Sequence, residues 1–476
     1  MMTRFPRTFI AVTMAALPLG ACSTTNNYNG AAEPVTAQAP AAKKAKNVIL
    51  FIGDGMGVST VTAARIYAGQ KQGQTGEEYV LPFEKFDHVA LVKTYNTNAQ
   101  VPDSAGTATA MHSGEKTKIG VVGVGAGVTR GDCASGLANP LQLLGEQVKG
   151  RGMALGIVST ARITHATPAS VYARAADRNW EADAAVPEGE RGKGCEDIAS
   201  QLIASDFDVA LGGGQSAFFG KDAGGRRIAA DANLPAEWAA LSGGTFVTDG
   251  AGLAAAPMDK PVLGLFSPSH MTYMAEKTAE KGAGEPTLTE MTKQAIARIK
   301  DDPDGYYLMV ESGRIDHGHH AGKAGFALEE AVEFANAIQA AIDSTDPEET
   351  LILVTADHSH VFTIAGYPRR GNDILGLVVP PDDGGDEVAG AAKAKDGKPY
   401  TTLGYANGPG AYTGDRPIPD VGVNAQQQAA IPKDSETHAG EDVALYGHGP
   451  GADGVKGVIE QNVVYDIIVK ALGWVK

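Results

Sequence analysis

The segment NVILFIGDGMG, residues 47–57, decides the fold class of this 476-residue chain. Its apolar run, residues 48–52, ends at a Gly-Asp-Gly turn that contains Asp54. A strand with apolar side chains on both faces is typical of a parallel sheet that helices cover on two sides. Ligands of such sheets bind just beyond the carboxyl ends of the strands. Asp54 is therefore our first candidate for a functional residue.

Similar apolar runs recur along the chain, and helix-like periodicity separates or follows several of them. The apolar runs are residues 153–159, 209–214, 262–266, 306–310 and 351–355. The helix-like stretches are residues 285–300, 325–343 and 463–472. Alternating strands and helices predict an α/β fold, a three-layer sandwich with a large, mostly parallel central sheet and helices on both faces. Residues 366–434 are rich in Gly, Pro, Asp and Gln, so we expect an inserted surface subdomain there.

The first 46 residues predict export rather than a folded domain. Two arginines precede an apolar run that is too short to span a bilayer, which is typical of a signal peptide, residues 1–21. The run ends in LGAC, which resembles a bacterial lipoprotein processing site with Cys22 as the lipidated residue. The alternative is a plain signal cut near the same place. Residues 22–46 have no apolar period and predict a flexible tether ahead of the domain at 47–476.

These features predict a periplasmic or membrane-anchored protein, and cleavage in the tether would release a soluble form. Two cysteines remain after the tether, Cys133 and Cys195, and an exported chain favours one disulfide over two buried thiols.

The net charge of −16 and the lack of a Lys or Arg block in the body argue against a nucleic-acid partner. An anionic substrate must then be captured by local charge or by metal.

Polar residues follow several of the predicted strands. They are Asp54, His165 with Thr167, Glu311, and Asp357 with His358. A single acid at one strand end is most often a turn or cap residue. Four such coincidences at one sheet edge instead favour a functional site.

The segment ESGRIDHGHH, residues 311–320, is the densest in potential metal ligands. Asp316 and His320 are four residues apart, so on a helix they share a face and could hold one ion. Carboxylate and imidazole ligands suit zinc, and His438 near the C-terminus would complete the set. We expect His317, His319 and His360 to lie outside the ligand set.

The segment PDSAGTATAM, residues 102–111, contains the candidate nucleophile. Ser104 follows Asp103 and is either the cap of a small-residue helix or a nucleophile held at its start. Backbone N–H groups at a helix start favour an anion, and an adjacent metal favours the alkoxide of a serine. An arginine must also hold the anion bidentately, and position alone leaves three candidates open: Arg162, Arg174 and Arg178.

Together these residues resemble the alkaline phosphatase family. The matching segments occur in the family's order and their wording is closest to the animal branch. They are residues 47–57, VPDSAGTATAMHSGEKT at 101–117, STARITHATPASVYARAADRNW at 159–180, VESGRIDHGHH at 310–320, VTADHSHVF at 354–362 and SETHAGEDVALYGHGP at 435–450. The resemblance implies that residues 47–476 form a catalytic domain that hydrolyses phosphate monoesters at alkaline pH.

The resemblance also implies roles for single residues and two Zn²⁺ and one Mg²⁺ per subunit. Ser104 becomes the phosphorylated nucleophile, and Arg178 holds the substrate phosphate. One zinc set is Asp316, His320 and His438, the other is Asp54, Asp357 and His358, and the magnesium set is Asp54, Thr167 and Glu311. Asp103, His165 and His360 are expected to support these ligands without binding an ion.

Further expectations follow from the same resemblance. The insertion at about 366–434 resembles a crown through which subunits meet, so a homodimer is expected. The animal branch forms a disulfide at the positions of Cys133 and Cys195. Ser267 stands where animal enzymes place a calcium-binding glutamate, which puts a calcium site in doubt. The rival functions are a phosphodiesterase of the same superfamily and a non-catalytic lipoprotein that binds phosphate or metal.

Overall fold

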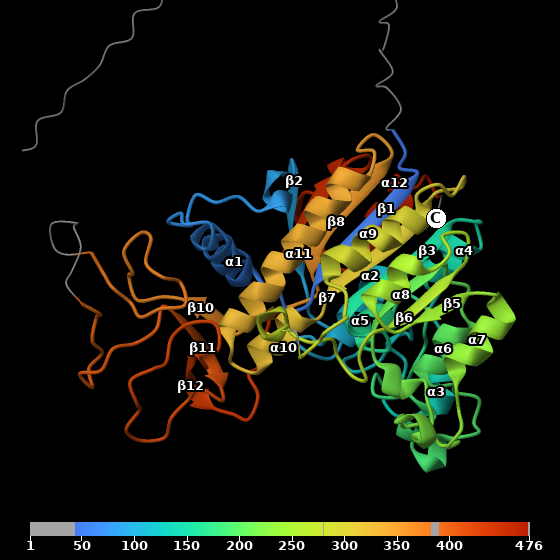
Figure 1. Cartoon of the computed structure of the whole chain (residues 1–476), viewed down its shortest axis with the longest axis horizontal. Helices are drawn as coiled ribbons and strands as arrows, with labels where there is room; N and C mark the ends of the chain where they lie inside the picture. Colours follow the sequence, from blue (N-terminus) through green and yellow to red (C-terminus); the bar gives the residue numbers. More distant parts are fainter. Residues whose placement is uncertain (1–42, 279, 382–389, 475–476) are drawn as a thin grey trace, which may run out of the picture. The chain divides into compact units, whose positions relative to one another are not determined.

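The computed structural model describes residues 43–278, 280–381 and 390–474, and a ten-stranded sheet is its main feature (Figure 1). The strands lie in the order β15-β2-β14-β8-β1-β7-β3-β4-β6-β5. Their bounds are β1 (Asn47–Gly53), β2 (His88–Lys93), β3 (Ala154–Arg162), β4 (Val209–Gly213), β5 (Thr245–Val247), β6 (Val262–Leu265), β7 (Tyr306–Ser312), β8 (Thr350–Ala356), β14 (Val443–His448) and β15 (Gly457–Glu460). Strand β14 is antiparallel to both neighbours, and the other pairs are parallel. The predicted α/β class and mostly parallel sheet are confirmed.

Helices pack on the sheet and on each other. They are α1 (Val58–Lys71), α2 (Ser104–Ser113), α3 (Cys133–Leu137), α4 (Leu144–Lys149), α5 (Ala166–Ala169), α6 (Ile198–Ala204), α7 (Leu234–Ser242), α8 (Gly250–Ala255), α9 (Leu288–Ile299), α10 (Arg314–His320), α11 (Ala324–Ser344) and α12 (Val463–Ala471). Helices α9 and α11 lie in front of the sheet in Figure 1 and pack together, whereas α12 packs with α2. Helix α9 begins at a capping box, in which Thr287 Oγ1 accepts from Glu290 N and Thr287 N donates to Glu290.

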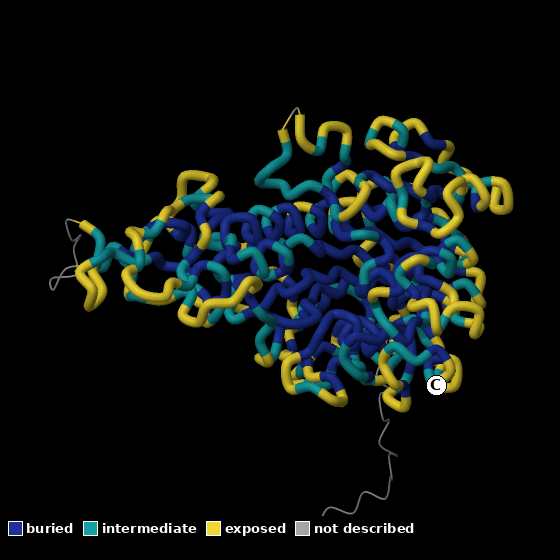
Figure 2. The backbone as a smooth tube through the Cα atoms, turned by 90° about the horizontal axis from the view of Figure 1, so that it is seen from below, coloured by how far each residue is buried: buried dark blue, intermediate teal, exposed yellow. Residues whose placement is uncertain are grey.

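All six apolar runs of the sequence are strands, namely β1, β3, β4, β6, β7 and β8. Strands β1, β7 and β8 are buried along their whole length, as expected for a parallel sheet with covered faces. Sequence reasoning missed β2, β5, β14 and β15. The side chains of β14 alternate between buried and half-buried, so its sequence lacks the continuous apolar run that identified the others. In Figure 2 the buried backbone is central and exposed segments surround it.

The region 366–434 contributes no strand to the ten-stranded sheet among its described residues. Instead β11 (Leu403–Gly408) and β12 (Gln428–Pro432) join β10 (Phe362–Ile364) in a separate three-stranded sheet (Figure 1). A short pair, β9 (Ser359–His360) with β13 (His438–Ala439), brings two distant histidine segments together. That this region serves as a subunit-binding crown stays a prediction.

Cys133 and Cys195 form a disulfide, as predicted, across a sequence separation of 62 residues. Cys133 begins α3 and packs in a small apolar cluster that includes Trp180. The predicted signal peptide, Cys22 and most of the tether lie outside the described residues. Among the helices that are described, none is long and apolar enough to cross a membrane.

Candidate active site

The register of the central strands places several predicted site residues at one edge of the sheet. Gly53 of β1 pairs with Ser312 of β7 and with Ala356 of β8. The three strands therefore end level with one another, and the residues next to these positions meet. They are Asp54, Glu311, Asp357 and His358, all of them fully buried. The strand-end pattern in the sequence thus predicted residues that the structure brings together at one edge of the sheet.

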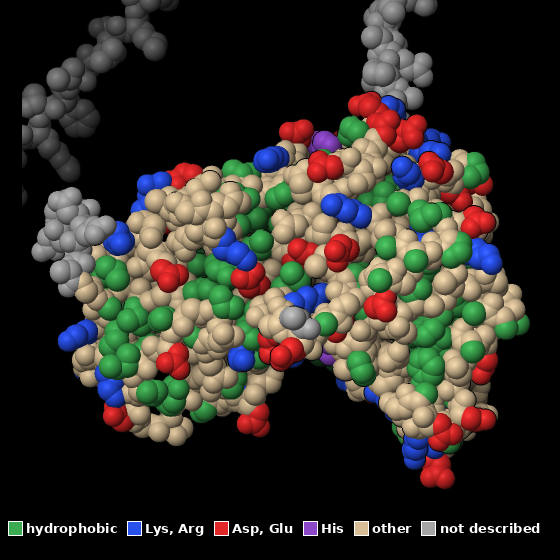
Figure 3. Space-filling view, viewed as in Figure 1, with side chains coloured by type: hydrophobic (Ala, Val, Ile, Leu, Met, Phe, Trp, Pro, Cys, Tyr) green, Lys and Arg blue, Asp and Glu red, His purple; other side chains and the backbone are tan. Residues whose placement is uncertain are grey.

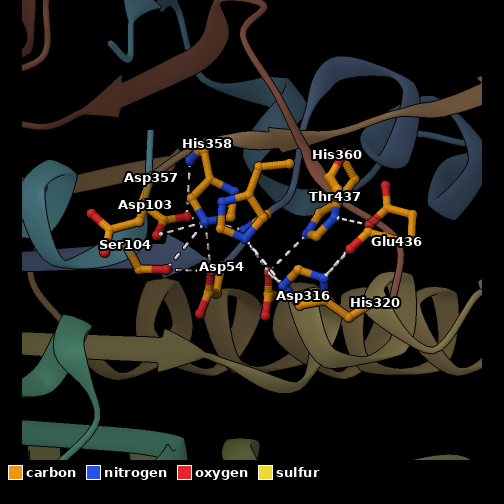
Figure 4. Close-up of polar contacts among 12 residues, drawn as sticks. Asp54, Asp103, Ser104, Asp316, His320, Asp357, His358, His360, Glu436 and Thr437 are labelled. Carbon is orange, nitrogen blue, oxygen red and sulfur yellow. Dashed lines mark hydrogen bonds and ion pairs between the residues drawn. The ribbon is translucent and has the colours of Figure 1, made fainter. Parts of the chain in front are cut away.

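Ser104 is the first residue of α2, and its side chain faces two of these strand-end residues (Figure 4). Ser104 Oγ lies 3.1 Å from His358 Nε2 and 3.4 Å from Asp54 Oδ1. Small residues let the start of the helix come close: a Cβ on Gly106 would lie 2.6 Å from Asn96 Nδ2. The cap of α2 is Asp103, whose side chain accepts from Gly106 N at 3.1 Å, so the interpretation of Ser104 as the cap is wrong. Ser104 is the first helical residue, and its hydroxyl faces the strand ends.

Arg178 is the one of the three candidate arginines that contacts the neighbour of Ser104. Its guanidinium donates to Asp103 Oδ2 at 2.9 Å, and its other nitrogen lies 3.0 Å from His165 Nε2. Arg162 instead binds Glu181, and Arg174 binds Glu146. Of the three candidates, Arg178 is the one that lies beside the start of α2, and its role as the phosphate-binding arginine stays a prediction.

A first group of potential metal ligands contains Asp316, His320, His360 and His438. One atom from each lies within 4.8 Å of the others. Asp316 Oδ1 is 3.3 Å from His320 Nε2, 3.3 Å from His438 Nε2 and 2.8 Å from His360 Nε2. The structure therefore places His360 among the potential ligands, whereas the sequence analysis expects it to support the ligands without binding an ion.

His360 is also held from its other side by Glu436, which sequence reasoning missed. Burial by itself lowers the pKa of His360, but hydrogen bonds with Asp316 and Glu436 raise it to about 9. The only sequence signal for Glu436 is its position, two residues before the candidate ligand His438 in the segment SETHAGED.

A second group contains Asp54, Asp316 and His358. Asp357 lies beside it, with Oδ2 at 3.5 Å from His358 Nε2. Its other oxygen accepts from Gly55 N at 3.0 Å, which fixes the carboxylate. The ring of His358 stacks on that of His438 at a centroid distance of 3.6 Å, so the first and second groups are contiguous.

A third group contains Asp54, Glu311 and His165. Thr167 is fully buried on α5, two residues after His165. Glu311 accepts a short hydrogen bond from Ser159. The structure thus brings a nitrogen of His165 within 4.8 Å of an oxygen of each of the two carboxylates, whereas the sequence predicts that this residue binds no ion.

Two other histidines of the segment 311–320 lie outside the three groups. His319 is buried between Thr60 Oγ1, at 3.0 Å, and Tyr405 Oη, at 2.9 Å. His317 packs on His270, with ring centroids 4.0 Å apart. Ser267 donates to the backbone carbonyl of His270 rather than offering a carboxylate.

The donor set fits divalent cations on grounds of charge and hydrogen bonding. Burial, followed by repulsion from neighbouring carboxylates, raises the pKa of Asp54 well above its usual value, and burial raises that of Glu311 to about 7. Several buried polar atoms lack a hydrogen-bond partner: Asp54 Oδ2, Asp357 Oδ2, Glu311 Oε1 and His165 Nδ1. Buried carboxylates are costly unless a cation compensates them. Burial also lowers the pKa of His358 and His320, which favours the neutral imidazole that binds metals.

The family model for alkaline phosphatase matches residues 45–474 of the chain. This chain belongs to the alkaline phosphatase family. The tissue-nonspecific alkaline phosphatase of Gallus gallus is 45% identical over 453 residues, which cover 88% of this chain and 83% of that protein. The Homo sapiens tissue-nonspecific isozyme is 43% identical, with coverage of 90% and 83%.

The solved alkaline phosphatase of Thermus thermophilus is similar in fold, with a TM-score of 0.67 at 22% identity over 91% of this chain and 92% of that chain. The family match and the curated relatives confirm the predicted activity: the enzyme hydrolyses phosphate monoesters, and its family implies divalent metal ions.

Figure 3 shows basic and acidic side chains interspersed over the visible face, without a continuous basic stripe.

Proposed function

We propose that the enzyme hydrolyses phosphate monoesters in two in-line steps through a phosphoserine at Ser104. The observation that carries this proposal is the position of Ser104 Oγ, at the start of α2 and 3.1 Å from His358 Nε2. Ser104 Oγ also lies 3.4 Å from Asp54 Oδ1, so the hydroxyl faces two members of the second ligand group.

Arg178 and the start of α2 hold the non-bridging oxygens of the phosphate. A guanidinium matches two such oxygens, and the N–H groups of the first helical turn point toward the same anion. Asp103 fixes the arginine from behind and caps the helix, so one carboxylate aligns both anion-binding elements. Because these donors are in place before the reaction, they stabilise the charge that develops in the transition state.

Two Zn²⁺ and one Mg²⁺ are proposed to bind at the three ligand groups, with Asp357 and Thr167 beside them as further ligands. The zinc sets are Asp316 with His320 and His438, and Asp54 with Asp357 and His358; the magnesium set is Asp54, Thr167 and Glu311. Histidine-rich sets suit zinc, and oxygen-rich sets suit magnesium. When bound, such ions stabilise negative charge on the attacking and leaving oxygens. His165 is a member of the third group, and its Nε2 lies 3.0 Å from a guanidinium nitrogen of Arg178, so it orients the arginine.

Export, lipid attachment at Cys22 and a homodimer belong to the same proposal. The sequence pattern of the first 46 residues supports export and anchoring. Exposed apolar side chains of the insertion support a subunit contact there, and they are Tyr367, Tyr412, Ile418, Val421 and Ile431.

The test compares three generic esters, a phosphate monoester, a phosphate diester and a sulfate ester, with the metal-loaded enzyme and its Ser104→Ala variant. The proposal expects strong preference for the monoester, and loss of that turnover in the variant. Preference for the diester would instead support the phosphodiesterase and would mean that Arg178 does not hold the substrate. No turnover of any ester with metals bound would support the binding lipoprotein.

A further inference from the structure

Glu436 is a buried acid that the reaction described above does not use. Its side chain is 1% exposed, and it lies two residues before His438, at the edge of the first ligand group (Figure 4). A buried carboxylate is retained at such a position only if neighbouring donors satisfy it. Its contacts lead to three members of that group, namely His320, His360 and, through His360, Asp316.

The backbone of Glu436 fixes the imidazole of His320. Glu436 N donates to the carbonyl oxygen of His320 at 3.0 Å, and His320 Nδ1 lies 2.7 Å from the carbonyl oxygen of Glu436. A carbonyl can only accept, so Nδ1 carries the proton and donates. Nε2 of His320 then keeps its lone pair and points at Asp316 Oδ1, 3.3 Å away. The ring is therefore held in the tautomer and orientation that a metal ligand requires.

The side chain of Glu436 fixes Asp316 through His360. Glu436 Oε2 accepts from His360 Nδ1 at 2.6 Å, and Glu436 Oε1 accepts from Val361 N at 2.9 Å. His360 Nε2 in turn contacts Asp316 Oδ1 at 2.8 Å. Each carboxylate oxygen of Glu436 thus accepts one hydrogen bond, and the imidazole of His360 bridges the carboxylates of Glu436 and Asp316.

We propose that Glu436 is a positioning residue that holds Asp316 and His320 in the geometry for binding an ion. This inference rests on the proposed function, because it takes these two residues as ligands. The role needs a carboxylate and not merely a side chain of this volume. A glutamine at 436 would turn its amide NH₂ toward either His360 or Val361 N, and each of these is already a donor.

The test measures zinc retention against a competing chelator for the wild type, Glu436→Gln and the control Glu330→Gln. Glu330 is also buried and accepts from a backbone amide, Met274 N at 2.7 Å, but it lies outside the three ligand groups. Loss of a residue that supports a metal ligand costs about 10–100-fold in metal affinity. We expect that loss for one zinc per chain in Glu436→Gln, none in Glu330→Gln, and recovery of kcat for Glu436→Gln in excess zinc. Zinc retention equal to the wild type in Glu436→Gln would overturn the inference.

Two further variants separate the possible causes of failure. Glu436→Asp keeps the charge and the backbone contacts, so it should retain zinc better than Glu436→Gln. The reverse order would mean that side-chain volume matters and would overturn the inference. Asp316→Ala tests the underlying function: unchanged zinc retention there would refute the ligand assignment itself, whereas weaker zinc there with wild-type retention in Glu436→Gln would refute only the role of Glu436.

Discussion

Asp103→Asn is the substitution that most sharply tests how the start of α2 is built. Asp103 Oδ1 accepts from Gly106 N and Asn96 Nδ2, both at 3.1 Å, and Oδ2 accepts from Gly120 N and Arg178 Nη1, both at 2.9 Å. An asparagine has one acceptor oxygen, so its NH₂ must face two of these donors. The side chain of Asn96 can turn over to accept, but the backbone N–H of Gly106 cannot. One unsatisfied buried donor costs about 1–3 kcal/mol.

We therefore expect Asp103→Asn to lower the free energy of unfolding by about 2 kcal/mol. We also expect kcat/KM for a monoester to fall about tenfold, because Arg178 then binds a neutral acceptor. Denaturant unfolding and steady-state kinetics measure the two effects. The matched control is Asp249→Asn, since Asp249 is an exposed cap whose side chain accepts from Gly252 N, and asparagine caps helices as well as aspartate does. Equal effects of the two substitutions would refute the four-donor argument.

Three further predictions concern other parts of the enzyme. Arg178→Lys keeps the charge but loses the planar fork, so kcat/KM for a monoester should fall about 10²-fold, and an unchanged value would contradict its proposed role. Burial raises the pKa of Glu330 to about 7, so the stability it contributes is present below its ordinary pKa of 4.5 and is lost as the pH rises through 7. Glu330→Gln should therefore raise the free energy of unfolding by about 2–3 kcal/mol at pH 8 and by at most about 1 kcal/mol at pH 5, and a pH-independent difference would exclude this ionisation as the cause. Replacing Cys133 and Cys195 together by serine should lower stability by about 4 kcal/mol, as expected for a closed loop of 62 residues; an unaltered denaturation midpoint would contradict this.

The fold, and the meeting of polar residues at one edge of the sheet, were predictable because the residues that build them carry strong local patterns. Runs such as 48–52 and 351–355 are apolar because both faces of the sheet are covered, and the polar residues that follow them mark the functional edge. Strand β14 was not predictable in this way, because its alternating pattern reflects one half-buried face and its antiparallel direction depends on distant partners.

Contacts between segments far apart in the chain were the other limit. The choice of Arg178 over Arg174 depends on which guanidinium reaches Asp103, 75 residues away, and no spacing encodes that. The role of Glu436 depends on the pairing of β13 with β9, which aligns His438 with His360. An acid in a loop gives no sign of such a partner until the chain is folded.

The most direct test of the central claim is to trap the covalent intermediate. The metal-loaded enzyme is mixed with a monoester, quenched in acid within a few turnovers, digested and analysed by mass spectrometry for the peptide that contains Ser104. The account predicts one phosphate on Ser104 in the wild type and none in Ser104→Ala, which should also lack turnover. Phosphate on another residue, or turnover by Ser104→Ala at the wild-type rate, would contradict it.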